Sequence, residues 1–217
     1  NPNAPTGIYL ELDQVEDIIA HNQDVIVIVD EAYVDFGTQS ALPLIEKYEN
    51  LLVVQTFSKS RSMAGMRIGY AIAASKVIRY LNDVKYSFNS YTMDQTTLAL
   101  GAAAIADRAY FEETVHKVVE TREWTKKELT KLGFVFGDSK ANFIFASHPE
   151  IPAADLFAAL REANIIVRYF NKPRIANYLR ITIGTQEDME KLIEFLKKYV
   201  TVQSQAKFQK TDVKCLH

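Results

Sequence analysis

Two apolar runs that each end in chemically active side chains constrain this chain most. The first run, Val25–Val29, leads into Asp30-Glu-Ala-Tyr33, and the second ends at Thr56-Phe-Ser-Lys59, with Arg67 eight residues later. Continuous β-branched runs are typical of strands that are buried on both faces of a parallel sheet. Ligands of open α/β sheets bind beyond the carboxyl ends of the strands, where side chains distant in sequence converge. The sequence therefore predicts a ligand site at one sheet edge.

The residue types after these two runs favour pyridoxal phosphate (PLP) as the ligand. A lysine amine can condense with the cofactor aldehyde, and Lys59 is the candidate. A carboxylate beside the pyridine nitrogen keeps the ring protonated and makes it an electron sink, which suits Asp30. The hydroxyl of Tyr33 can donate to the phenolate oxygen. The phosphate needs hydroxyl and guanidinium donors; the candidates are Thr56, Ser58 and Arg67.

Each of these residues has a plainer explanation when it is taken alone. A polar residue at a strand end, such as Asp30, can simply cap the following turn. Lysines such as Lys59 are usually solvated at the surface, and exposed arginines are often members of weak ion pairs. The joint order of the residues is what favours a cofactor site.

Four segments in this order resemble the signatures of fold-type I PLP-dependent aminotransferases, most closely the histidinol-phosphate branch. The resemblance runs from Asn1 to about Val200. The segments are Asn1-Pro-Asn-Ala-Pro-Thr-Gly7, Asp30-Glu-Ala-Tyr33, Thr56-Phe-Ser-Lys59 with Arg67, and Tyr178-Leu-Arg180-Ile-Thr-Ile-Gly-Thr185.

The resemblance implies a role for each matching residue. Lys59 is the Schiff-base lysine, Asp30 is the partner of the pyridine nitrogen, and Tyr33 is the donor to the phenolate oxygen. Arg180 binds the acidic group of the substrate, and Arg168, in the strand before it, helps to hold a substrate phosphate. The phosphate of the cofactor is held by Thr56, Ser58 and Arg67.

The chain departs from the family pattern in its opening motif, where Ala4 replaces a second asparagine. That asparagine usually contacts the phenolate oxygen, so either Asn3 takes over the contact or the hydrogen bond is absent. The resemblance also implies that the chain begins in the middle of the cofactor domain. Either it is a fragment of a longer protein or it is a truncated relative without catalysis, and the intact motifs favour a fragment.

The resemblance implies an aminotransferase that moves an amino group between histidinol phosphate and 2-oxoglutarate in histidine biosynthesis, as a homodimer. An aromatic or aspartate-type aminotransferase is the alternative, and a non-catalytic PLP-fold domain is another. Two arginines, Arg168 and Arg180, suit a phosphate, whereas one suffices for a carboxylate. A scaffold would need none of the residues expected to hold the cofactor.

Composition narrows the other function classes. A net charge of -2 disfavours nucleic-acid binding, for which a basic stripe is expected. The single cysteine, Cys215, cannot form an internal disulfide, which favours a reducing compartment. No apolar run is long enough for a membrane span, no signal peptide is apparent, and the cytoplasm is expected. The histidines lack the spacing of metal ligands; they are His21, His116, His148 and His217.

The pattern along the chain predicts an α/β fold in two parts. Strands alternate with helices up to residue 108, which indicates part of a PLP-binding large domain with a mostly parallel sheet and flanking helices. Residues 109–202 read as a small α/β domain that follows a long helix, and residues 203–217 as a tail. The expected strands are Val25–Val29, Leu51–Thr56, Ile68–Ala73, Phe134–Phe136, Asn142–Ala146, Ile165–Arg168 and Tyr178–Ile183. The expected helices are Leu12–His21, Leu42–Tyr48, Lys76–Lys85, two within residues 94–132, Ala153–Glu162 and Glu187–Tyr199.

Overall fold

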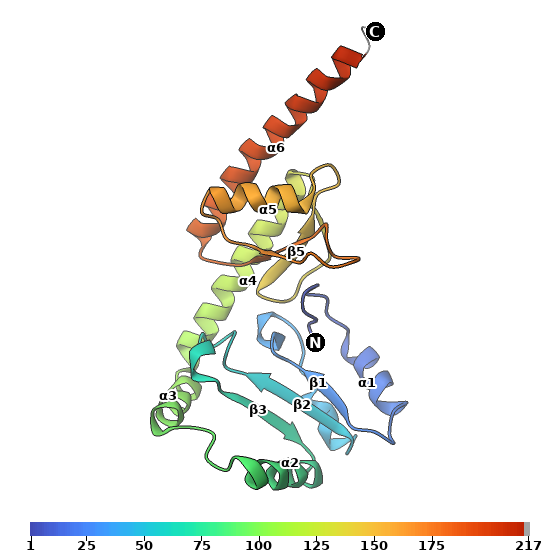
Figure 1. Ribbon diagram of the computed structural model, residues 1–217. Helices are drawn as coiled ribbons and strands as arrows, with labels where there is room; N and C mark the ends of the chain where they lie inside the picture. Colours follow the sequence, from blue (N-terminus) through green and yellow to red (C-terminus); the bar gives the residue numbers. More distant parts are fainter. Residues whose placement is uncertain (215–217) are drawn as a thin grey trace. The chain divides into compact units, whose positions relative to one another are not determined.

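The computed structural model describes residues 1–214 of the chain (Figure 1). Cys215 and His217, considered above, lie outside the described residues. The chain forms two compact units. The first joins Asn1–Ala4 to Ile8–Lys117, and the second joins Pro5–Gly7 to the chain from Val118 onward. The point of division, between Lys117 and Val118, lies inside helix α4 (Arg108–Lys131).

A sheet with the strand order β1-β2-β3 is the centre of the first unit (Figure 1). Strand β1 (Val27–Asp30) pairs in parallel with β2 (Leu51–Thr56), which pairs antiparallel with β3 (Gly69–Ala73). The expectation of parallel pairing is therefore wrong for β3. A parallel partner is usually reached through a crossover α-helix, which returns the chain to the starting edge of the sheet. The link from β2 to β3 contains only a 3-10 turn, Ala64–Met66.

One face of this sheet carries the core of the first unit. Helix α1 (Leu12–Ala20) packs Val15 and Ile19 against Val29 of β1 and Val53 of β2. The other face is open at β1, where Ile28 is 61% exposed, although its partner Leu52 on β2 is buried. The prediction that Val25–Val29 is buried on both faces is therefore wrong for the described residues.

Helices complete the first unit in the order that the sequence pattern predicts. Short 3-10 turns follow β1, at Val34–Phe36 and Leu42–Glu46. Helix α2 (Ser75–Phe88) follows β3, and α3 (Gln95–Ala106) begins where the Asp94 side chain accepts a hydrogen bond from the Thr97 N–H. This N-cap satisfies one of the donors that every helix leaves unpaired at its start.

A four-stranded antiparallel sheet is the centre of the second unit. The strand order is β4-β5-β7-β6. The strands are β4 (Val135–Phe136), β5 (Phe143–Ser147), β6 (Arg168–Tyr169) and β7 (Leu179–Thr182). Gly133, at φ +81°, follows the end of α4, and the Phe134 N–H donates to the Leu129 carbonyl, which closes the helix.

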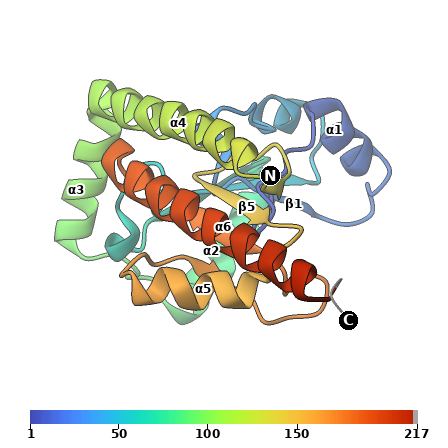
Figure 2. The same cartoon turned by 90° about the horizontal axis from the view of Figure 1, so that it is seen from above.

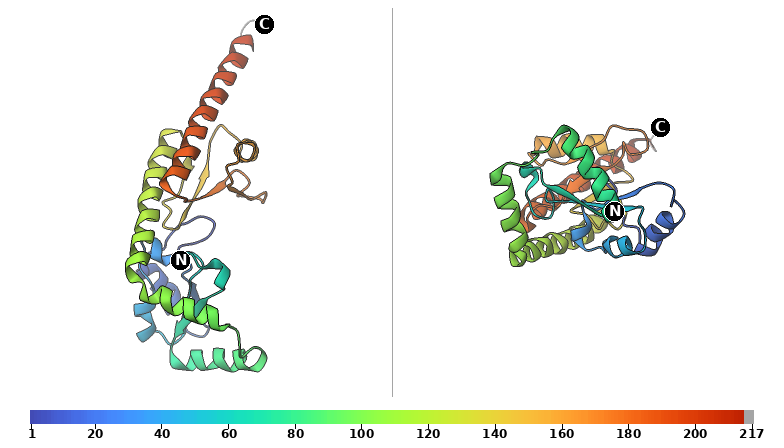
Figure 3. Two further views of the ribbon diagram at one scale, coloured as in Figure 1. Left: turned by 90° about the vertical axis from the view of Figure 1, so that its left-hand side faces the viewer. Right: turned by 90° about the horizontal axis from the view of Figure 1, so that it is seen from below.

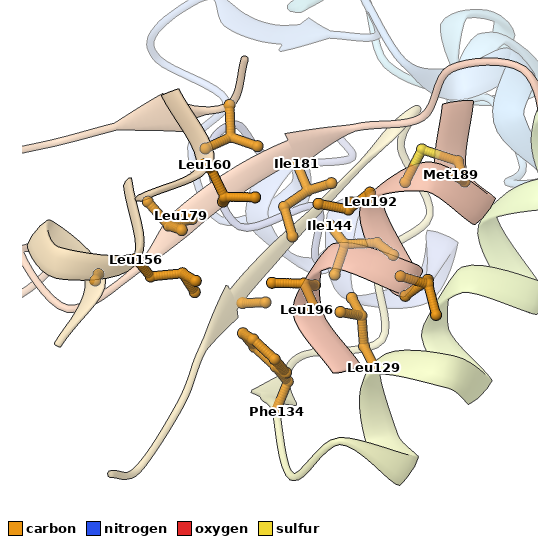
Figure 4. Close-up of a cluster of buried hydrophobic side chains, with 14 of the residues drawn as sticks. Leu129, Phe134, Ile144, Leu156, Leu160, Leu179, Ile181, Met189, Leu192 and Leu196 are labelled. Atoms are coloured by element: carbon orange, nitrogen blue, oxygen red, sulfur yellow. The ribbon is translucent and has the colours of Figure 1, made fainter. Parts of the chain in front are cut away.

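The core of the second unit lies on one face of this sheet (Figure 4). Strand residues Ile144 and Ile181 pack against α5 (Ala153–Glu162), α6 (Gln186–Lys214) and the end of α4. The end of α4 and α6 run side by side (Figures 2 and 3), with Leu129 and Leu196 in the same cluster. Because side chains alternate along a strand, Phe143, Phe145 and Arg180 belong to the opposite face.

Two predicted elements of the second unit differ from the structure. Helix α6 continues to Lys214, so residues 203–214 of the predicted tail are helical. The stretch after Tyr199 contains neither glycine nor proline, and its lysines, glutamines and alanine favour helix. Strand β6 begins only at Arg168, because the Ile165 N–H is used to close α5 by donating to the Leu160 carbonyl. No helix within residues 1–214 is long and apolar enough to cross a membrane.

Candidate active site

The end of β1 and the end of β2 lie at the same edge of the first sheet. Asp30 is the last residue of β1 and Thr56 the last residue of β2, and the two strands are parallel. Strand β3 runs the opposite way and begins at Gly69, which is paired with Thr56. Arg67, two residues before β3, therefore reaches this edge as well. The structure thus brings together six of the predicted residues: Asp30, Tyr33, Thr56, Ser58, Lys59 and Arg67.

Lys59 lies in the loop after β2 with its side chain exposed. Its Nζ is 5.7 Å from the centre of the Tyr33 ring, a cation–π contact that links the two predicted catalytic segments. In the described part of the chain its amine forms no ion pair with a carboxylate. The next residue is fixed, because the buried Ser60 hydroxyl donates a short hydrogen bond to the Asp35 carboxylate. The amine is therefore held near Tyr33 by its backbone and remains available for reaction.

Asp30 presents its carboxylate at the sheet edge. Its Oδ1 accepts the Ala32 N–H at 3.0 Å, which leaves acceptor capacity for an external N–H on the same carboxylate. The backbone nitrogen of Asn1 donates to the Asp30 carbonyl, which places the opening segment beside this strand end. Within that segment the Asn3 N–H donates to the Ile8 carbonyl at 2.8 Å, so Asn3 lies in a turn of the same unit.

Hydroxyl groups and a guanidinium surround the Lys59 loop. The Thr56 Oγ1 lies 2.9 Å from the Ser58 Oγ and accepts the Ser58 N–H at 3.1 Å. Arg67 adopts a left-handed backbone conformation, with φ +56°, and its Nη1 donates to the Ala64 carbonyl at 2.9 Å. Left-handed non-glycine residues are strained, and such strain concentrates at ligand sites. These donors have the chemistry of a phosphate site.

Glu31 is a buried carboxylate beside this edge that the sequence reasoning missed. It is 3% exposed, and it accepts hydrogen bonds from the Ser40 hydroxyl, the Ala41 N–H and the Gln55 amide, at 2.6, 2.6 and 2.8 Å. These bonds tie the end of β1 to β2 and to the following loop. No local signal distinguishes Glu31 from Asp30, since both are acids at the end of the same run.

Tyr70 extends this network across the sheet. Its hydroxyl donates to the Gln55 Oε1 at 2.6 Å, and its ring meets the Phe57 ring edge-on at 5.9 Å between centres. Burial raises the pKa of Tyr70, and the negative charge of Asp35 raises this pKa further. The phenol therefore stays protonated at neutral pH and acts as a donor.

Arg168 and Arg180 form a second cluster, in the second unit. They are directly opposite each other on β6 and β7 and therefore share one face of the sheet. The Cζ of Arg168 is 5.5 Å and that of Arg180 5.8 Å from the centre of the Phe170 ring, and the Arg180 Cζ is also 5.1 Å from that of Phe143. Neither guanidinium forms an ion pair with a carboxylate within residues 1–214. The buried Arg180 Nε has no hydrogen-bond acceptor among the described residues.

Opposed like charges without a counter-ion are unfavourable in a sheet. An anion that lies between Arg168 and Arg180 would relieve this repulsion and satisfy the Arg180 Nε. The register of β6 and β7 makes the two arginines cross-strand neighbours. This face of the second sheet has the charge and the donors of an anion site.

Comparison with known proteins agrees with the α/β fold and the order of the motifs. The chain matches the model of the family "Aminotransferase class I and II" over residues 1–196. It is 54% identical over 200 residues to the histidinol-phosphate aminotransferase of Lactococcus lactis subsp. cremoris, which covers 92% of this chain and 56% of that protein. It is 55% identical over 198 residues to that of Brachyspira hyodysenteriae, covering 91% and 56%. The chain thus spans about half the length of these curated relatives.

Solved structures share the fold. The histidinol-phosphate aminotransferase of Clostridium acetobutylicum superposes with a TM-score of 0.82 at 24% identity, over 93% of this chain and 62% of that one. The enzyme of Sinorhizobium meliloti in complex with pyridoxal-5'-phosphate gives 0.80 at 23% identity, over 93% and 56%. The predicted α/β architecture is confirmed by these likenesses. Since the family model also spans both units, the chain belongs to the class I and II aminotransferase family.

Proposed function

We propose that the protein carrying this chain is a PLP-dependent aminotransferase that moves an amino group between histidinol phosphate and 2-oxoglutarate. The observation that carries the proposal is the convergence of Lys59, Asp30, Tyr33 and Arg67 at one edge of the first sheet. The names of the relatives support the choice of substrate. A regulator or scaffold would not need a lysine, an aspartate and a tyrosine at the same sheet edge.

The residues at this edge fit PLP in their chemistry. The cofactor supplies an aldehyde that an amine can attack and a ring that withdraws electrons when its nitrogen is protonated. Lys59 offers the amine, which holds the cofactor and then moves a proton at the substrate Cα. Asp30 offers the acceptor that keeps a proton on the ring nitrogen, and Tyr33 offers a hydroxyl donor to the phenolate oxygen. These three are the proposed catalytic residues.

The remaining donors at the edge suit the cofactor phosphate. Thr56 and Ser58 bring hydroxyls that already lie within hydrogen-bonding distance of each other. Arg67 brings a guanidinium, which can bind two phosphate oxygens at once. Asn3 is the proposed replacement for the asparagine missing at Ala4, because its turn belongs to the same unit. We assign the first unit to the large, cofactor-binding domain and the second unit to the small domain.

The second unit supplies the proposed substrate contacts. Arg180 binds the acidic group of either substrate, the phosphate of histidinol phosphate or a carboxylate of 2-oxoglutarate, and Arg168 adds a second guanidinium for a phosphate. A phosphomonoester carries nearly two charges near pH 7 and three acceptor oxygens, so it can engage both arginines. A carboxylate engages mainly one. The unpaired state of the two opposed guanidinium groups supports this assignment.

Labelling of the reactive lysine tests the cofactor site. Borohydride reduction of the intact protein with PLP, followed by peptide mapping, should place a pyridoxyl group on Lys59. Lys59→Ala should lose both the label and the visible absorbance, whereas Lys76→Ala, at an exposed lysine of helix α2, should keep them. A label on any other lysine contradicts the assignment, and its absence from the protein points to the non-catalytic alternative.

Substitution of the carboxylate separates chemistry from binding. Asp30→Ala should retain PLP but raise the barrier to transamination by about 3–4 kcal/mol, as when a preorganised charged partner is removed. Single-turnover rates measure this barrier. A rate close to that of the wild type would show that Asp30 only caps its strand.

Substrate choice is tested at the second unit. Arg168→Ala should lower kcat/KM for histidinol phosphate by an amount equal to about 1–3 kcal/mol in barrier height, the range for a charge-assisted hydrogen bond. It should lower kcat/KM for 2-oxoglutarate much less. Arg180→Ala should harm both half-reactions. Equal losses for the two substrates in Arg168→Ala would instead favour an aromatic or aspartate-type aminotransferase.

The proposal includes a cytoplasmic homodimer, as the resemblance implies. Sedimentation of the intact protein should give twice the mass of one chain, and fractionation of cells should recover it with the cytoplasm. A monomer with full activity would refute the assembly while leaving the proposed chemistry intact.

A further inference from the structure

Phe170 lies between the two opposed arginines of the second unit. It follows β6 and is two residues from Arg168, so both side chains share one face of the sheet. Its ring centre is 5.5 Å from the Arg168 Cζ and 5.8 Å from the Arg180 Cζ. Among the rings of the described residues, Phe170 is the one with cation–π contacts to both guanidinium groups of the pair.

The position of the Phe170 ring is itself fixed by its neighbours. The ring meets Phe145 edge-on, at 6.2 Å between centres, and Phe145 stacks on Tyr178 at 4.7 Å. Phe145 is also opposite Arg180 in the register of β5 and β7. An aromatic layer anchored in the sheet therefore supports the ring that faces both arginines.

This arrangement addresses an electrostatic problem. Two guanidinium groups that face each other across a strand pair repel, and long side chains can separate into solvent. The negative face of one aromatic ring attracts both cations and holds them together. A ligand that needs both groups at once then binds to a pair that is already assembled. A ligand that needs only one group gains less.

We propose that Phe170 is a positioning residue that pre-assembles Arg168 and Arg180, and thereby favours a dianionic phosphate over a carboxylate at this site. The inference rests on the proposed function only in that the two arginines face the substrate. The reacting atoms and the cofactor do not enter the argument. Sequence reasoning gave no role to Phe170, although its spacing from Arg168 puts it on the same face of β6.

The expected effect follows from the entropy of ordering the two side chains. Each long side chain that must be immobilised on binding costs about 0.5–1.5 kcal/mol. Phe170→Leu keeps an apolar side chain but removes the aromatic face that holds Arg168, whereas Arg180 keeps its contact with Phe143. Phosphate binding must then order Arg168, so phosphate affinity should fall by about twofold to tenfold, whereas acetate affinity, for which Arg180 alone suffices, should change by less than about twofold.

The experiment measures inorganic phosphate and acetate binding to the intact protein loaded with PLP, by calorimetry. Phe170→Tyr should restore the wild-type preference, because it keeps the aromatic face. Phe134→Leu is the matched control: Phe134 is 5% exposed in the core on the opposite face of the same sheet, and no cation–π contact joins it to either arginine among the described residues. It should lower thermal stability yet leave phosphate affinity within about twofold.

Three results would overturn the inference: unchanged phosphate affinity in Phe170→Leu, an equal loss in Phe134→Leu, or no recovery in Phe170→Tyr. Should Phe170→Leu fail to fold, Phe170→Met provides the same loss of the aromatic face with a flexible apolar chain. The proposed function fails separately, if borohydride leaves Lys59 unlabelled. In that event the phosphate preference and its dependence on Phe170 can still be measured on the protein without PLP.

Discussion

Replacement of the buried Glu31 gives the sharpest test of how the sheet edge is held. In Glu31→Ala the Ala41 N–H, the Ser40 hydroxyl and the Gln55 amide all lose their acceptor. Ala41 is 2% exposed, so its N–H cannot turn to water. Removing one partner of a buried charged network costs about 3–5 kcal/mol. Glu31→Gln keeps one acceptor oxygen but points an amide donor at other donors, so we expect a loss of about 1–3 kcal/mol.

Urea denaturation followed by circular dichroism measures these losses, and hydrogen exchange locates them. The Ala41 amide should exchange about a hundredfold faster in Glu31→Ala, the factor that corresponds to roughly 3 kcal/mol. The control is Glu46→Gln, an exposed acid of the same unit, which should stay within about 0.5 kcal/mol of the wild type. The reasoning is refuted if Glu31→Gln unfolds at the same urea concentration as the wild type and the exchange of Ala41 does not change.

Three further substitutions probe other contacts. Gly7→Ala should destabilise the second unit by about 1–3 kcal/mol in urea, because Gly7 has φ +74° and a Cβ would lie 2.1 Å from the Ser139 Oγ; an unchanged midpoint would contradict this. Arg61→Lys should lower the melting temperature and reduce the free energy of unfolding by about 1 kcal/mol, since the Arg61 guanidinium stacks 4.0 Å from the centre of the Phe111 ring. Hydrogen bonds from Lys126 and a second lysine hold the pKa of Asp138 below its usual range. The ionised Asp138 therefore stabilises the fold fully at a pH above its unfolded pKa. This stabilisation is lost as the pH falls through its folded pKa. Lys126→Met should therefore flatten the loss of stability below about pH 4, and an unaltered pH profile would count against the pair.

The fold was predictable where one local pattern decides the structure. The β-branched run of β2 (Leu51–Thr56) has the predicted bounds, and the alanine-rich α3 forms where helix propensity is high. The orientation of β3 was not predictable from periodicity, because the same apolar alternation suits a parallel or an antiparallel partner. The length of α6 was underestimated because the apolar period fades after Tyr199, whereas the absence of glycine and proline allows the helix to continue.

The site was predictable to the extent that strand ends share an edge. Asp30 and Lys59 could be placed together from the sequence, since each follows an apolar run. The hydrogen bonds that hold this sheet edge together could not be predicted from the sequence. The Glu31 carboxylate accepts a hydrogen bond from Gln55, which is distant in the sequence, and the Asp35 carboxylate accepts a hydrogen bond from the Ser60 hydroxyl. Such distant hydrogen bonds leave no periodic trace, because any polar side chain at those positions would give the same local pattern.

The membership of Pro5–Gly7 in the second unit determines the order in which that unit can be completed during synthesis. The Gly7 carbonyl accepts the Lys140 N–H at 2.9 Å, so these early residues lack their partner until Lys140 has left the ribosome. Ribosomes add roughly 5–20 residues each second, and the first unit emerges within that interval. The first unit can therefore form before the second, which must then recover a segment made long before the rest of it. A peptide that starts at Val118 would lack the acceptor for the Lys140 N–H.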